Sequence, residues 1–66
     1  MTNKELGTLI KRQRKLNRLS QQDVAEKINS TRAQISRIEN AVIDPGFSSV
    51  VSILETLGKT ILINDK

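Results

Sequence analysis

One eight-residue segment, 32–39, combines two isoleucines at helical spacing with several side chains that donate or accept hydrogen bonds. If it is helical, its inward positions are Ile35 and Ile38, and the opposite face is polar or small: Arg32, Ala33, Gln34, Ser36 and Arg37. Arginine pairs bidentately with guanine O6 and N7, and an alanine methyl can meet the methyl of thymine. We predict that these five residues read bases. An ordinary surface helix has a similar polar face, so the prediction depends on the elements around it.

The residue types that support most catalytic and metal chemistry are missing. The 66-residue chain has no histidine and no cysteine, which removes disulfides and nearly all zinc sites. No glycine-rich phosphate loop is present, and Asp23 and Glu26 occupy helix-start and surface positions. We therefore expect no enzyme, no cofactor and no metal.

Positive charge is concentrated in the first 18 residues. The chain has a net charge of +4, and this segment holds one acidic residue, Glu5, against six basic ones: Lys4, Lys11, Arg12, Arg14, Lys15 and Arg18. Clustered basic charge indicates a polyanionic partner. A solvated helix face is the alternative interpretation. If the partner is DNA, we expect long-range attraction from these residues and a contact of Lys15 with the DNA backbone.

Two helices are predicted in the first half of the chain. The first begins at Thr2 or Asn3 and ends near Asn17 and Arg18, with an apolar stripe at helical spacing: Leu6, Leu9, Ile10 and Leu16. The second spans about 21–28. Ser20 is its N-cap and Asp23 places a carboxylate at its positive end, while its buried face consists of Val24, Ala25 and Ile28.

Two more helices follow. Asn29-Ser30-Thr31 forms a turn in which Asn29 takes the left-handed conformation, and Thr31 caps a helix over about 32–39. Asn40 is a second left-handed candidate. After a loop closed by Pro45-Gly46, the last helix runs over about 47–57 until Gly58 stops it, with a mostly buried apolar set: Phe47, Val50, Val51, Ile53, Leu54 and Leu57.

The two middle helices and their three-residue turn form a helix-turn-helix pattern. The predicted fold is all-α, with a four-helix DNA-binding domain over 1–58 and a tail over 59–66. The tail contains a β-branched run that reads as a short strand, Thr60, Ile61, Leu62 and Ile63. A lone strand needs a partner for its backbone groups, and so small a domain needs support. We therefore predict that this strand pairs across a homodimer; a disordered or core-packing tail is the alternative.

Several short segments are distinctive as a set: Arg14-Lys15, Leu19-Ser20-Gln21, Val24-Ala25, Ile35-Ser36-Arg37-Ile38-Glu39-Asn40 and Pro45. On these residues, and over about 6–58, the chain resembles the lambda-repressor/Cro-type helix-turn-helix proteins, also called the XRE family. The resemblance implies that Arg32, Ala33 and Arg37 face bases, and that Arg14 and Glu39 form a buried ion pair.

The resemblance also implies contacts with the DNA backbone. Gln21 opens the second helix, touches a phosphate and braces the third helix, and Thr31 and Asn40 hold the backbone. Together with Ser20 and Lys15, these residues make up our predicted backbone set. Two positions depart from the family pattern: Arg18 and Asn29 stand where glycine is usual. Asn29 can take the required conformation, whereas Arg18 would be strained, so Asn17 is a substitute left-handed residue.

The ending of the chain is similar to that of HipB-type antitoxins, in which C-terminal strands pair across the dimer. This similarity implies a dimeric repressor of its own operon that binds a palindromic operator in double-stranded DNA and neutralises a HipA-like kinase toxin. The alternatives are a stand-alone phage or chromosomal repressor of the Cro type, and a basic helical adaptor that binds protein. No apolar run is long enough to span a membrane and no signal peptide is evident, so we expect a cytoplasmic protein.

Overall fold

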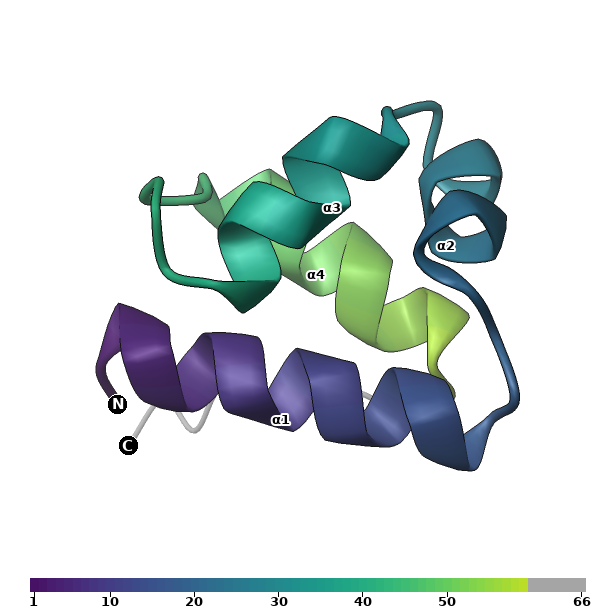
Figure 1. Ribbon diagram of the computed structural model, residues 1–66, viewed down its shortest axis with the longest axis horizontal. Helices are drawn as coiled ribbons and strands as arrows, with labels where there is room; N and C mark the ends of the chain where they lie inside the picture. The colour runs from purple at the N-terminus through teal and green to yellow at the C-terminus, as the bar shows by residue number, and fades with distance from the viewer. Residues whose placement is uncertain (60–66) are drawn as a thin grey trace, which may run out of the picture.

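The computed structural model describes residues 1–59, which form four helices: α1 (Asn3–Leu16), α2 (Gln21–Lys27), α3 (Arg32–Glu39) and α4 (Phe47–Thr56) (Figure 1). The all-α architecture is therefore confirmed for this part of the chain. The predicted strand, residues 60–63, lies outside the described residues. None of the helices within 1–59 has the length and apolarity that a membrane span requires.

The helices begin where the sequence supplies caps. Thr2 and Ser20 each form a capping box, in which the cap hydroxyl accepts a backbone N–H three residues later and that residue's carboxylate accepts the cap's own N–H. The Thr2 and Ser20 backbone N–H groups lower the pKa values of Glu5 and Asp23 by stabilising the charged carboxylates. Thr31 caps α3 by accepting the Gln34 N–H at 3.1 Å.

All four helices end in the same hydrogen-bonded turn, in which the residue after the C-cap is left-handed. That residue is Arg18 after α1, Asn29 after α2 and Ala41 after α3, each with φ +58°, and Gly58 after α4 with φ +77°. At each end, the next residue donates its N–H back to a carbonyl of the last helical turn, as Leu19 does to Arg14 at 3.0 Å.

The predictions that Asn17 and Asn40 are left-handed were wrong. Both are C-caps with negative φ, −87° and −94°, because the hydrogen-bond pattern requires the left-handed residue one position later. Each asparagine instead donates its side-chain amide to the carbonyl four residues earlier. Asn29, which stands where glycine is usual in the family, has the left-handed conformation that we predicted.

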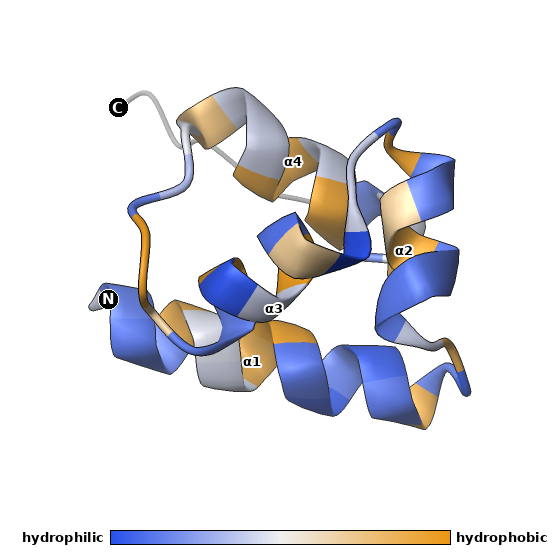
Figure 2. Ribbon diagram, turned by 45° about the horizontal axis from the view of Figure 1, so that its top comes forward, coloured by the Kyte–Doolittle hydropathy of each residue, from blue (hydrophilic) through white to orange (hydrophobic). Residues whose placement is uncertain are grey.

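One core joins all four helices. Its fully or nearly buried members are Ile10, Val24, Ala25, Ile35, Ile38, Ile53, Leu54 and Leu57. In Figure 2, hydrophobic (orange) segments of α1 and α4 lie on the sides that face α3, and the second half of α1 is mostly hydrophilic (blue). Two residues predicted to be apolar packing positions are exposed: Leu16 at 68% and Phe47 at 65%. Each lies at the end of its helix, where the neighbouring elements no longer cover that face.

At Gly7, α1 packs closely against the C-terminal end of α3. A methyl group built there would lie 2.4 Å from the Glu39 carbonyl oxygen and 2.8 Å from that of Ile38. These are backbone atoms, so no side-chain rotation relieves the clash. Gly7 therefore sets the distance between α1 and the C-terminal end of α3.

We predict that Gly7→Ala destabilises the protein by about 1–3 kcal/mol, the usual cost of an overpacked contact. Urea unfolding followed by circular dichroism measures the loss. Gly46→Ala is the control, because no atom lies within 4 Å of the added methyl at that position. Equal stability of Gly7→Ala and wild type would contradict this packing.

Candidate nucleic-acid interface

Buried side chains and a hydrogen bond in the turn hold α2 and α3 together. Val24 and Ala25 on α2 and Ile35 on α3 have no exposed surface. The turn between the helices is closed by the Ser30 N–H, which donates to the Ala25 carbonyl at 2.8 Å. The outer face of α3 is thus presented by a fixed frame, as a DNA-reading helix must be.

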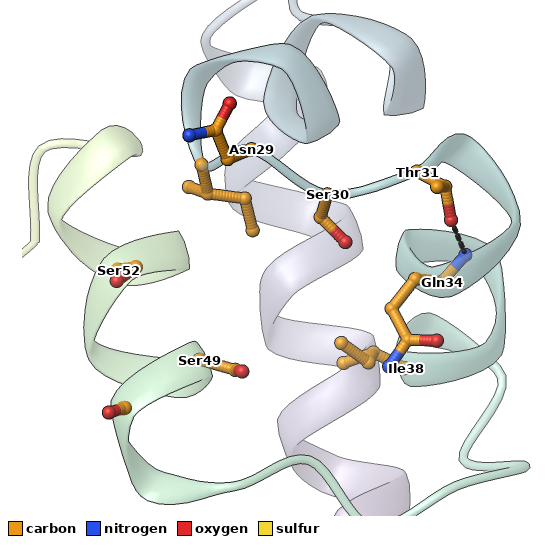
Figure 3. Close-up of a pocket in the computed structure, with 9 residues that line it drawn as sticks. Asn29, Ser30, Thr31, Gln34, Ile38, Ser49 and Ser52 are labelled. Atoms are coloured by element: carbon orange, nitrogen blue, oxygen red, sulfur yellow. Dashed lines mark hydrogen bonds between the residues drawn. The ribbon is translucent and has the colours of Figure 1, made fainter.

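The structure divides the five predicted base-reading residues into two groups. Arg32, Ala33 and Arg37 are exposed on α3, whereas Gln34 and Ser36 are half-buried. Gln34 lines a groove together with Ile38 (Figure 3). Ser36 lies beside the Asn40 amide, which donates to the Ser36 carbonyl at 2.9 Å. The face of α3 with the greatest exposure therefore consists of Arg32, Ala33 and Arg37.

The groove in Figure 3 has a volume of about 480 Å³ and separates α3 and the α2–α3 turn from the first turns of α4. Hydroxyl groups dominate it: Ser30, Thr31, Ser48, Ser49 and Ser52. Sequence reasoning did not select the three α4 serines, because serine in the first turns of a helix has no spacing that distinguishes a groove from ordinary surface.

A smaller notch of about 380 Å³ lies on the α2 side of Arg32. It is lined by Arg14, Ser20, Gln21, Gln22 and Arg32. Four of these residues belong to the predicted sites, and the structure brings them together although they come from three segments. Gln22 was missed; its position in the first turn of α2, directly after Gln21, was the available signal.

Beneath the notch is a buried ion pair between α1 and α3. Arg14 Nε donates to Glu39 Oε2 at 2.7 Å and Arg14 Nη2 donates to Glu39 Oε1 at 3.0 Å, a bidentate arrangement. The hydrogen bonds to Glu39 raise the pKa of Arg14. Arg14 and Glu39 are 8% and 7% exposed. This is the pair that the family resemblance implies.

Two further hydrogen bonds extend the pair. Gln21 Nε2 donates to Glu39 Oε1 at 3.2 Å, and Arg14 Nη1 donates to the Leu19 carbonyl at 3.0 Å. Glu39 therefore binds α1 and α2 at once, while Arg14 fixes the segment that leads into α2. No buried side-chain nitrogen or oxygen within residues 1–59 lacks a hydrogen-bond partner.

The residues predicted to contact the DNA backbone lie at the ends of α2 and α3 and on α1. The Ser20 and Thr31 hydroxyls accept backbone N–H bonds as caps, which leaves each O–H free to donate. Asn40 is exposed at the C-terminal end of α3, and Lys15 is exposed on α1. The two hydroxyls and the Lys15 ammonium can each donate a hydrogen bond to an anionic oxygen.

Comparison with known proteins gives one finding. A protein-family model described as helix-turn-helix matches residues 10–63, which is most of the chain. No curated protein matches it. The matched region contains α2, the turn, α3 and both members of the ion pair.

We predict that Glu39→Ala destabilises the protein by about 3–5 kcal/mol, because the substitution leaves the Arg14 charge buried without its partner. Thermal and urea unfolding measure the effect. Glu55→Ala, which removes an exposed carboxylate from α4, is the control and should stay within about 0.5 kcal/mol of wild type. Similar small losses for both variants would show that the pair contributes little.

Proposed function

Because the chain belongs to the helix-turn-helix family, a family of sequence-specific DNA-binding regulators, we propose that it represses transcription as a homodimer on a palindromic operator. The supporting observation is the exposed face of α3, with Arg32, Ala33 and Arg37 presented by a frame locked through Glu39. Arg32 and Arg37 offer bidentate donors to guanine, and Ala33 a methyl contact to thymine.

In this proposal α3 lies in the major groove while α2 lies above it. The two copies of α3 in the dimer occupy successive grooves on one face of the duplex, about 34 Å apart. Contacts with the DNA backbone fix the position of α3 along the major groove. They come from Gln21 and Ser20 at the start of α2, Thr31 at the start of α3, Asn40 at its end, and Lys15 on α1. Gln34 and Ser36 contribute to base reading from the edges of this face.

The dimer is proposed to form through residues 60–63 of each chain. Support comes from their β-branched composition. The same residues support a finer proposal, that the protein is a cytoplasmic antitoxin whose partner is a HipA-like kinase toxin. Co-purification from the native host tests this: recovery of a stable kinase partner supports it, and recovery of the regulator alone on its operator contradicts it.

We predict that Arg32→Ala combined with Arg37→Ala abolishes the specific gel shift of a duplex selected from a random pool by the wild-type protein. Arg32→Lys combined with Arg37→Lys is the matched control for charge. It should retain salt-sensitive binding but lose sequence preference, because lysine lacks the planar fork of arginine. Both variants should melt like wild type. A specific shift that survives in the alanine variant would overturn the assignment of α3.

We predict that deletion of residues 60–66 shifts the protein from dimer to monomer in sedimentation equilibrium and weakens operator binding in parallel. Ile61→Pro in the full-length chain is the subtler variant, since proline removes one backbone N–H from a strand pair. It should weaken the dimer in the same direction. Normal dimerisation of both variants would mean that the subunits associate elsewhere.

A further inference from the structure

Arg18 stands in a backbone conformation that most side chains avoid. Its φ is +58°, in the left-handed region that glycine adopts without steric penalty and other residues adopt at a cost of about 1 kcal/mol. The turn needs this conformation, because the Arg18 N–H donates to the Lys15 carbonyl and the Leu19 N–H donates to the Arg14 carbonyl, each at 3.0 Å. Glycine would make the same two bonds without strain.

Nothing that the structure describes for the Arg18 side chain offsets this cost. The residue is exposed, and within residues 1–59 its guanidinium takes part in no hydrogen bond or ion pair. Its contribution to folding is therefore unfavourable. Arg18 thus places an exposed cation at a turn position where glycine would make the same backbone hydrogen bonds, and its guanidinium is available for a partner.

The position of Arg18 indicates what that partner is. The next residue, Leu19, accepts a hydrogen bond from Arg14 at 3.0 Å, and Arg14 lines the notch beside Ser20 and Gln21. Arg18 thus precedes Ser20, which lines that notch, by two residues. It is also the last of six basic side chains in the first 18 residues, against one acidic one.

We propose that Arg18 contacts a DNA phosphate next to the one that Gln21 contacts, so that α1, the turn and α2 follow the same strand. The inference rests on the proposed function, because it presupposes DNA along α3. It extends that function in a specific way: the side chain at the left-handed turn position contributes to affinity. Since the guanidinium meets a phosphate, its effect is independent of base sequence and sensitive to salt.

Ala41 provides a matched comparison. It has the same φ of +58° at the equivalent turn after α3, but its side chain carries no charge. Replacement by glycine relieves the same strain at both sites. Only the replacement of Arg18 removes a cation.

The test uses full-length wild type, Arg18→Gly, Arg18→Gln and Ala41→Gly with duplex DNA of mixed sequence. Affinity is measured over a range of salt concentrations, and stability by urea unfolding. We expect both glycine variants to unfold at higher urea than wild type. We expect Arg18→Gly and Arg18→Gln to bind several-fold more weakly, with a log–log salt slope shallower by about 0.9, the loss of one phosphate contact. Ala41→Gly should keep the wild-type slope.

Wild-type slopes in both Arg18 variants would overturn the proposal, as would an equal loss of slope in Ala41→Gly. Either result leaves the DNA-binding assignment intact, provided that the wild type itself binds the duplex with a steep salt dependence. If the wild type does not bind DNA, the proposed function fails and the Arg18 assignment fails with it. The two failures are therefore distinguishable in one set of titrations.

Discussion

The fold depends most on the bidentate hydrogen bonding of Arg14 to Glu39, because this pair joins three helices at one buried point. Glu39 accepts from Arg14 on α1 and from Gln21 on α2 while it belongs to α3. Two buried charges gain little net stability over apolar residues, yet either one left alone is costly. The pair thus acts as a constraint on geometry: α3 can take only the position in which all the hydrogen bonds are made.

The rest of the interface follows from that constraint. Gly7 allows α1 to approach the Glu39 carbonyl, which brings Arg14 within reach of the carboxylate. With α3 fixed at its C-terminal end by Glu39 and its first turn stabilised by the Thr31 cap, its outer face takes no part in holding the helix in place. Arg32 and Arg37 are therefore free to extend toward a partner. Apart from Arg14, the basic side chains of α1 are exposed, which leaves them available for long-range attraction to a polyanion: Lys4, Lys11, Arg12 and Lys15.

Much of the fold could be predicted from the residues, and the failures have physical reasons. Ser20, Asp23 and Thr31 signal helix starts through local hydrogen bonds, so α3 has the predicted bounds and α2 ends one residue earlier. Helix ends were harder, because the left-handed position is set by the pairing of the last carbonyls rather than by residue preference; Arg18 and Ala41 take it although Asn17 and Asn40 stand beside them. The exposure of Leu16 and Phe47 and the half-burial of Gln34 depend on neighbouring helices, which periodicity does not reveal.

The most direct test of DNA recognition through α3 is a titration of isotopically labelled protein with a duplex selected from a random pool, followed residue by residue through its amide resonances. Recognition through α3 predicts the largest shifts in the turn before α2, the first turn of α2, the α2–α3 turn and all of α3. The resonances of the second half of α4, around Ile53 and Leu57, should move little. Large shifts confined to α4, with α3 unchanged, would contradict recognition through this helix.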